Sequence, residues 1–219
     1  MFYKPETYPW TSSFIEKFDE IKKELFQVID RPLAELNKST WAPERPNLLT
    51  SEYKKEEAWK TYTFRFFGID HLPNCESCPT IYSLIKNQPK LVTVEFSLLE
   101  PNTHVLPHRG FTDLLLRSHL GVKIPEGDSG IKVDGIQKTW ENGRFIVFDD
   151  SLTHEAWNKT DQQRVVLMID FVPELSKHSP KEICKIVLHK NTDEHTLAIA
   201  PLEKWKEWLE DGQFPTGKK

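Results

Sequence analysis

Between residues 91 and 172 the sequence contains short apolar runs separated by tight turns. Residues 91–99, 144–148 and 164–172 are runs typical of β-strands. The dipeptides Asp134-Gly135 and Asn142-Gly143 are typical of hairpin turns, because these residue types tolerate the positive φ angles that such turns need. One hairpin is expected over 130–140. Short strands at close intervals predict an antiparallel sandwich or barrel rather than a parallel sheet.

Helical patterns lie on both sides of this region. Apolar residues recur at helical spacing over 12–29, where Thr11, Ser12 and Ser13 offer capping hydroxyls and Arg31-Pro32 ends the helix. Three further segments also predict helices, the last two packed against the sheet: residues 81–86, 180–188 and 201–209.

The stretch between the first helix and the strand region is mixed. Residues 40–58 are polar and contain prolines, which predicts a loop, and residues 60–67 alternate as a strand does. The chain of 219 residues suits a single domain. We expect a mainly β fold with flanking helices: a mixed N-terminal part (1–90), a strand core (91–173) and a helical C-terminal part (174–219).

Charge and hydropathy limit the partners. The formal net charge is −4, which favours neither nucleic acid nor an anionic membrane. No apolar run approaches the roughly 20 residues that cross a bilayer, and the first residues lack the apolar segment of a signal peptide. A cytoplasmic location is therefore expected.

The three cysteines are Cys75, Cys78 and Cys184, an odd and low number that argues against a fold built on disulfides. Cys75 and Cys78 have the spacing of a redox or zinc motif, but no second pair follows. Structural thiols are favoured, and a local disulfide or a zinc or redox role stays open.

Two histidines are candidate metal ligands. His108 follows a proline at a strand end, and His154 follows a turn. Neutral imidazoles on neighbouring strands can hold a divalent metal, although either histidine alone is more often a residue without a ligand role.

Basic residues accompany both histidines. In the strand expected over 113–120, alternation places Leu115, Arg117 and His119 on one face. A cation on an inward face is costly unless it is paired, so a bound anion or a buried carboxylate is expected beside Arg117. Arg164 opens another apolar strand, where it can lie at a cavity mouth. Taken singly, each arginine fits a surface ion pair.

From Phe96 to Pro173 the sequence resembles the aspartyl/asparaginyl β-hydroxylase family. The matching strings run collinearly over about a third of the chain: residues 101–110, 116–121 with Ile124-Pro125, 140–143, 148–158 and 164–170. The resemblance implies a double-stranded β-helix, that is, a jelly-roll, cupin-like fold. It also implies Fe(II) as cofactor, with 2-oxoglutarate and O₂ as cosubstrates.

The resemblance assigns roles to individual residues. His108 and His154 match the iron ligands, and Arg164 matches the residue that holds the far carboxylate of 2-oxoglutarate. Residues at four further positions match groups around the cosubstrate: Arg117 and His119 at its other end, Ser97 in contact with it, and Trp59 near it.

The third metal position differs from the common pattern of two histidines and one carboxylate. Gly110 occupies the place of that carboxylate and supplies no ligand. The family also lacks it, which implies a water there. Asp150 is then a candidate for orienting this water or His154, and direct ligation by Asp150 is the alternative.

The implied activity is hydroxylation of an unactivated C–H bond, foremost at the β-carbon of an aspartyl, asparaginyl or related amino-acid substrate. The alternatives are hydroxylation of a lipid A acyl chain and a non-catalytic jelly-roll binding module. Segments 40–58, 68–80 and 174 onward are expected to form the substrate pocket. Because no tetratricopeptide extension is present, a small free molecule or a carrier-bound amino acid is as suitable a substrate as a protein. The sequence predicts no oligomeric state.

Overall fold

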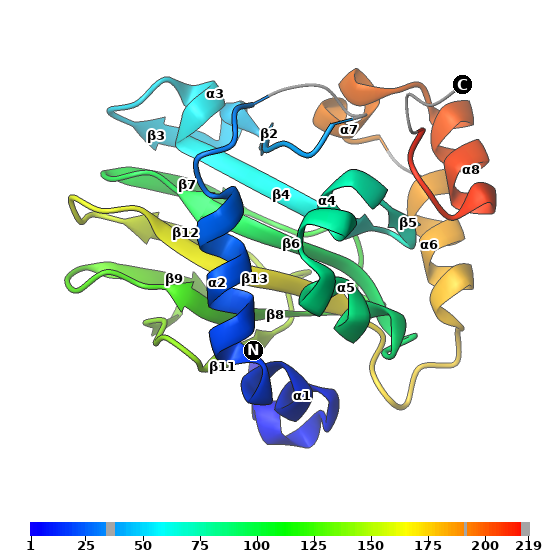
Figure 1. Ribbon diagram of the computed structural model, residues 1–219, viewed down its shortest axis with the longest axis horizontal. Coiled ribbons are helices and arrows are strands. Elements are labelled where there is room, and N and C mark those ends of the chain that lie inside the picture. Colours follow the sequence, from blue (N-terminus) through cyan, green and yellow to red (C-terminus); the bar gives the residue numbers. More distant parts are fainter. Residues whose placement is uncertain (34–37, 191, 216–219) are drawn as a thin grey trace.

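The computed structural model describes residues 1–33, 38–190 and 192–215, and its strands form two antiparallel sheets that face each other (Figure 1). The larger sheet has the order β1-β11-β8-β13-β6-β4-β2, with β5 beside β4. Its strands are β1 (Phe2–Tyr3), β2 (Ala42–Pro43), β4 (Trp59–Phe66), β5 (Ile69–Asp70), β6 (Leu91–Leu99), β8 (Leu116–Lys123), β11 (Phe145–Phe148) and β13 (Arg164–Phe171).

The smaller sheet has the order β10-β9-β12-β7-β3. Its strands are β3 (Leu49–Ser51), β7 (Thr103–His108), β9 (Ser129–Val133), β10 (Ile136–Lys138) and β12 (His154–Asn158). The helices are η1 (Pro5–Thr7), α1 (Trp10–Glu16), α2 (Phe18–Val28), η2 (Pro46–Leu48), α3 (Lys55–Ala58), α4 (Leu72–Ser77), α5 (Pro79–Lys86), α6 (Pro180–His189), α7 (Glu194–Ile199) and α8 (Leu202–Asp211).

The path of the chain through the sheets is that of a jelly roll. Strands β6, β8, β11 and β13 are neighbours in the larger sheet, whereas β7, β9, β10 and β12 are neighbours in the smaller one. The chain therefore crosses repeatedly between the sheets, which confirms the predicted double-stranded β-helix.

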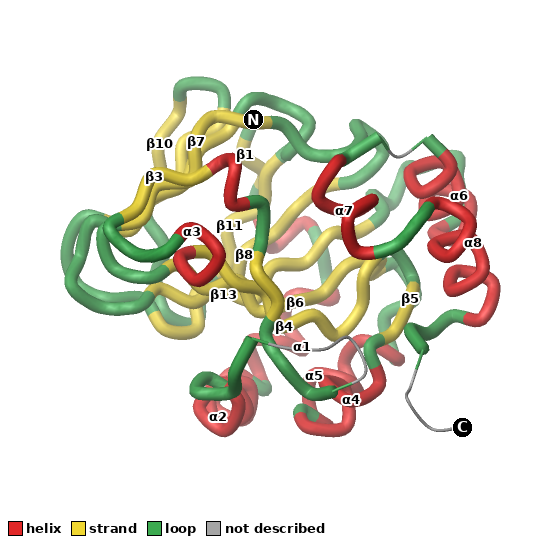
Figure 2. Tube along the Cα trace, turned by 90° about the horizontal axis from the view of Figure 1, so that it is seen from above, coloured by secondary structure: helices red, strands yellow, loops and turns green. Residues whose placement is uncertain are grey.

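Along β6, alternate residues face the hydrophobic core under the helices and the space between the two sheets. All nine residues of this strand are buried. Phe96 and Leu98 pack into the cluster under the helices, whereas Ser97 points to the opposite face, between the sheets. Helices α1, α2, α4 and α5 cover the outer face of the larger sheet, and α6 and α8 lie at one end of the molecule (Figure 2). The space between the sheets holds a further apolar cluster, with Val105 and Val133 from the smaller sheet and Val166 from the larger, and polar side chains such as Ser97 lie beside it.

The two hairpin dipeptides have different outcomes. Asp134 and Gly135 have φ angles of 49° and 79° and join β9 to β10, as predicted. Asn142 and Gly143 do not close a hairpin, because β10 lies in the smaller sheet and β11 pairs with β8 and β1 in the larger. The Asn142 side chain instead bonds the backbone of Ile124 through both its oxygen and its nitrogen. The prediction of a hairpin at Asn142-Gly143 was wrong, because this turn carries the chain from the smaller sheet to the larger.

The predicted N-terminal helix is divided in two. Lys17, with φ −104° and ψ 16°, separates α1 from α2. The break allows Phe14 of α1 and Ile21 of α2 to be buried completely in the same cluster. The expected capping hydroxyls do not accept from helix N–H groups; Ser12 and Ser13 donate to the carbonyls three residues earlier.

Other predicted bounds need correction. The segment 40–58 is not a loop but contains β2, η2, β3 and α3, and α4 lies within 68–80. The strand predicted over 113–120 begins at Leu116 and continues to Lys123. The predicted parts 1–90 and 174–219 each include residues outside the description, namely 34–37, 191 and 216–219.

All three cysteines are buried free thiols, so the disulfide alternative is not realised. Burial raises the pKa of Cys184 to about 12 and raises the pKa values of Cys75 and Cys78 as well. These thiols are therefore poor nucleophiles. Among the described helices, none is long and apolar enough to cross a membrane.

Candidate functional site

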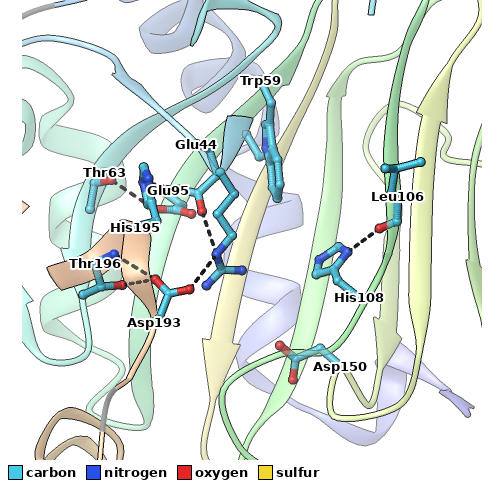
Figure 3. Close-up of polar contacts among 12 residues, drawn as sticks. Glu44, Trp59, Thr63, Glu95, Leu106, His108, Asp150, Asp193, His195 and Thr196 are labelled. Atoms are coloured by element: carbon cyan, nitrogen blue, oxygen red, sulfur yellow. Dashed lines mark hydrogen bonds and ion pairs between the residues drawn. The ribbon is translucent and has the colours of Figure 1, made fainter. Parts of the chain in front are cut away.

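The two candidate ligand histidines meet on the smaller sheet. His108 ends β7 and His154 begins β12, and the two residues are direct partners in the strand pairing. Their ring centroids lie 4.2 Å apart. His108 Nδ1 lies 2.8 Å from the Leu106 carbonyl oxygen (Figure 3). In the same way, His154 Nδ1 lies 2.9 Å from the carbonyl oxygen of Leu152. Donation from Nδ1–H leaves both Nε2 atoms free to bind a metal.

The charge state of this pair also suits metal binding. Burial lowers the pKa of His108 to about 4. Burial, with the neighbouring His108 ring, lowers the pKa of His154 to about 3. Both imidazoles are therefore neutral at pH 7, which is the protonation state that ligates a metal.

Within the part of the chain that the structure describes, no third protein ligand joins the pair. Over residues 1–33, 38–190 and 192–215 there is no group of three His, Cys, Asp or Glu residues that could hold a metal ion. Direct ligation by Asp150, the alternative considered above, therefore has no geometric support. Two histidines leave coordination positions open, as catalytic metal sites require.

Asp150 occupies the space that a side chain at position 110 would need. A β-carbon built on Gly110 would overlap the Asp150 carboxylate, and the Gly110 N–H donates to the Asp150 carbonyl oxygen at 2.7 Å. Burial raises the pKa of Asp150 to about 7, against the opposing effect of Arg117. Gly110 thus stands where a metal-binding carboxylate is usual, and the carboxylate that fills this space belongs to Asp150, in the loop before β12.

Replacing Gly110 with alanine should therefore destabilise the fold. The added methyl collides with the Asp150 carboxylate, and overpacking of this kind costs roughly 1–3 kcal/mol. The double variant Gly110→Ala/Asp150→Ala should be more stable than the sum of the single effects, because it removes the collision. Urea unfolding of the four proteins in this cycle measures the coupling, and strictly additive effects would contradict the overlap.

A buried cation lies across the barrel from the histidines. Arg164, at the start of β13, is 2% exposed and has no carboxylate partner within the described chain. Its Nη1 donates to the Ser97 carbonyl oxygen at 3.0 Å, and its Nε is buried without a hydrogen bond. Burial alone lowers the pKa of Arg164 to about 9. A buried guanidinium without a carboxylate partner is costly, so the surroundings of Arg164 fit a bound anion.

His119 is a second orphaned group beside Arg164. Its Nδ1 accepts from Trp140 Nε1 at 3.3 Å, and its Nε2 is buried without a hydrogen bond. The Arg164 guanidinium lies 4.5 Å from the Trp140 ring centre. Burial lowers the pKa of His119 well below its usual range, so the ring is neutral. His119 thus lies beside Arg164, whereas the resemblance placed it at the opposite end of the cosubstrate. Together, Arg164 and His119 offer the polar contacts that one end of a dicarboxylate needs.

Aromatic and polar contacts join the metal and anion sites into a closed ring. Trp59 Nε1 donates to Ser97 Oγ at 3.1 Å, and the Trp59 ring lies 6.2 Å from that of His108. On the other side, the Phe148 ring lies 5.1 Å from His119 and 5.7 Å from His154. The ring thus passes through residues on both sheets: His108, Trp59, Ser97, Arg164, Trp140, His119, Phe148 and His154. The structure therefore brings together six of the seven predicted metal- and cosubstrate-binding residues.

Arg117 is the seventh, and its position differs from the prediction. Its Nε and Nη2 donate to the two carboxylate oxygens of Asp170 at 2.7 and 2.8 Å, and Nη2 lies 3.3 Å from Asp150. The structure shows one of the two partners predicted for this cation, a buried carboxylate. Arg117 thus has its charge matched within the protein, and it holds Asp150 near Gly110.

One cavity borders the site at His108, and a second shares Arg45 and Phe111 with the first. The outer cavity, about 640 Å³, is lined by His108, Gly110 and Phe111, together with residues of the segment after β2 and the end of α6. The inner cavity, about 280 Å³, is lined by Thr63 and Glu95 and by residues from 40–45, 71–74 and 195–214. All three segments predicted to form the substrate pocket therefore line one cavity or the other.

Several residues of this site were missed in the sequence. Asp170 is the partner of Arg117 because β8 and β13 pair in register, a long-range contact that no local pattern reveals. Glu95 shares an inward face with Ser97, and this alternation was a usable signal. Arg45 and Phe111 lie in segments without periodicity and line both cavities.

The fold and these residues define a jelly-roll protein with a two-histidine metal site and an adjoining anion site. Residues 16–173 match the family model described as "Aspartyl/Asparaginyl beta-hydroxylase". Because this match covers most of the chain, the protein belongs to that family, as the resemblance predicted.

Two of the three relatives described next carry the names of hydroxylases. The chain is 32% identical over 208 residues to the ornithine lipid ester-linked acyl 2-hydroxylase of Rhizobium tropici, a match that covers 94% of this chain and 72% of the relative. It is 29% identical over 187 residues to the human aspartyl/asparaginyl beta-hydroxylase, covering 80% of this chain and 24% of the relative. It is 30% identical over 182 residues to the mouse aspartate beta-hydroxylase domain-containing protein 2, covering 78% and 53%.

Proposed function

We propose that the protein is a hydroxylase that depends on Fe(II) and 2-oxoglutarate. The observation that carries this proposal is the buried, unpaired Arg164 with the orphaned Nε2 of His119, across the barrel from a neutral histidine pair. A metal at the pair and a dicarboxylate at the arginine would satisfy every orphaned group of the ring. The proposed reaction converts substrate C–H, O₂ and 2-oxoglutarate into substrate C–OH, succinate and CO₂.

In this proposal the iron supplies the oxidation of the C–H bond, and the protein supplies placement. His108 and His154 hold the metal through Nε2, oriented by their Nδ1 contacts to Leu106 and Leu152. Asp150, held by Arg117, would orient a water beside the two histidines.

The other end of the cosubstrate lies among the anion-site residues. Arg164 holds its far carboxylate by a charge-assisted fork, and His119 Nε2 lies beside Arg164. Trp59 fixes the Ser97 hydroxyl by a hydrogen bond and packs near His108, so it closes the cosubstrate space against solvent.

Two substrate classes follow from the family. The first is the β-carbon of an aspartyl or asparaginyl residue or of a related amino acid. The second is an acyl chain of a lipid, and the Rhizobium tropici relative favours it because that match covers 94% of this chain. The non-catalytic alternative is disfavoured because the named relatives are hydroxylases.

The test is product analysis with both substrate classes. Purified protein is incubated with Fe(II), 2-oxoglutarate and either an aspartyl and asparaginyl peptide set or an acylated amino lipid, and succinate and products are followed by mass spectrometry. We expect iron-dependent succinate and a product heavier by one oxygen atom in one of the two sets. Absence of iron-dependent succinate in every reaction, including those without substrate, would overturn the proposal.

A further inference from the structure

The inner cavity carries acidic groups that the proposed chemistry does not use. Its walls include Glu95 of β6 and Glu44 after β2, together with His195 of α7 (Figure 3). Arg45 and Phe111 line both this cavity and the outer one at His108, and the Arg45 guanidinium lies 4.6 Å from the Phe111 ring centre. The two side chains thus separate the inner cavity from the metal side of the barrel.

Glu95 is the distinctive group of the inner cavity. It is 4% exposed, and its Oε2 accepts from Thr63 Oγ1 at 3.0 Å. Within the described chain no lysine, arginine or histidine forms an ion pair with it, and Oε1 has no hydrogen bond. Burial, with the Glu44 carboxylate, raises the pKa of Glu95 to about 8 although Arg117 opposes the shift. A buried carboxyl group with one oxygen that lacks a hydrogen-bond donor is costly, unless a ligand supplies that donor.

The neighbouring cation does not balance this carboxyl. The Arg45 Nε lies 3.5 Å from Glu44 and 3.5 Å from Asp193, so two carboxylates already share that guanidinium. His195 lies 3.9 Å from Glu44 and adds charge only when protonated. When Glu95 is ionised, the cavity walls carry two carboxylates, Glu95 and Glu44, against one permanent cation, Arg45. Burial and Glu44 disfavour that ionised form, so a bound cation would stabilise it, whereas a bound anion would not.

The position of Glu95 relates the cavity to the cosubstrate site. Glu95 and Ser97 lie on the same face of β6, two residues apart, which corresponds to about 7 Å along a strand. Ser97 contacts both Trp59 and Arg164. A group bound at Glu95 therefore lies close to the proposed site of reaction. A substrate that extends past Phe111 can occupy both places.

We propose that the inner cavity binds a primary ammonium group of the substrate, with Glu95 and Glu44 as its acceptors. The cavity walls also carry Phe66, Trp205 and Phe214, which suit the methylene groups and the cation itself. A metal ion fits less well, since no three-donor group occurs in the described parts of the chain. The inference rests on the proposed function and names the chemistry of its substrate, an amine borne by a free molecule or by a lipid headgroup.

Binding of matched probes tests the inference. n-Pentylammonium, n-pentanol and pentanoate are titrated into the protein loaded with Fe(II) and 2-oxoglutarate without oxygen, and affinity is measured by calorimetry. We expect the ammonium probe to bind more tightly than either of the others. Glu95→Gln, which keeps the size of the side chain, should weaken ammonium binding at least about tenfold, because hydrogen bonds to charged groups are the strong ones.

Two further variants make the result decisive. Glu210→Gln removes an exposed carboxylate on α8 that pairs with Lys181 and Lys185, and it should leave ammonium binding unchanged. Glu44→Gln should weaken binding as well, and it replaces Glu95→Gln if that variant fails to fold by circular dichroism. Equal affinity of wild type and both cavity variants for n-pentylammonium would overturn the inference.

A second arm distinguishes the two sources of the amine. Phosphatidylcholine vesicles with and without stearylamine are sedimented with the protein, and N-acetyl-lysine is titrated separately. Glu95-dependent binding to the stearylamine vesicles indicates a lipid headgroup, whereas Glu95-dependent binding of N-acetyl-lysine alone indicates a free amine. Vesicle binding that Glu95→Gln leaves unchanged reflects attraction of a protein of net charge −4 and counts against the inference. Iron-dependent succinate formation is measured in parallel, so failure of ammonium binding alone leaves the proposed function standing.

Discussion

Replacing His108 or His154 with alanine abolishes iron binding and succinate formation, if the site works as proposed. Each variant leaves one imidazole, and no other ligand is placed to compensate in the described residues. Loss of a group that merely supports a metal ligand already costs roughly 10–100-fold in metal affinity or activity. We therefore expect losses of at least about 100-fold in iron affinity, measured by equilibrium dialysis with metal analysis, and succinate formation at background.

His104 provides a matched control for these variants. It lies on β7 as His108 does, but its Nε2 pairs with Glu155 at 2.8 Å and its side chain is 36% exposed. His104→Ala should retain iron and turnover. Succinate formation that persists in His154→Ala, with its iron bound, would refute the ligand assignment.

Replacing Arg164 with methionine should weaken the use of 2-oxoglutarate and also stabilise the protein that lacks it. Truncating one partner of a buried charge pair costs about 2–5 kcal/mol, so the apparent KM for 2-oxoglutarate should rise roughly 30-fold or more. Without cosubstrate the same guanidinium is buried and unpaired, so its removal should raise the melting temperature. Steady-state kinetics and thermal melting of the same preparation measure both effects.

Two comparisons separate this role from a general effect of charge. Arg164→Lys keeps the positive charge but loses the fork, and it should fall between wild type and Arg164→Met. Arg144→Met removes an exposed arginine that pairs with Glu141, and it should change neither quantity. An unchanged KM for 2-oxoglutarate in Arg164→Met would show that the cosubstrate binds elsewhere.

Local patterns in the sequence predict much of this fold because the core strands are buried on both faces and therefore consist of continuous apolar runs. The run at 91–99 matches β6, and Asp134-Gly135 forms the turn between β9 and β10. Asn142-Gly143 has the same turn chemistry but changes sheets, because the choice of partner strand depends on distant contacts such as the bond from Asn142 to Ile124. Dipeptides fix the local turn, whereas topology fixes what the turn connects.

The site residues also divide into those that the sequence predicts and those that depend on long-range contacts. The histidines and Arg164 could be predicted because they occur together on strings that match the family, although each residue alone has an ordinary structural explanation. The pairing of Arg117 with Asp170 could not, since the two residues are 53 positions apart and meet only through strand register. Arg45 was overlooked because it lies in a polar segment, yet its backbone has φ 26° and its side chain lines both cavities. Such strain in a residue other than glycine often marks a ligand site.

The most direct test of the central claim is spectroscopic. Protein loaded with Fe(II) without oxygen is titrated with 2-oxoglutarate, and the visible charge-transfer absorption that chelation of Fe(II) by a 2-oxo acid produces is recorded. We predict a saturable band in the wild type, a band only at much higher 2-oxoglutarate in Arg164→Met, and none in His154→Ala. A wild-type protein that binds iron but shows no band at any 2-oxoglutarate concentration would contradict the account.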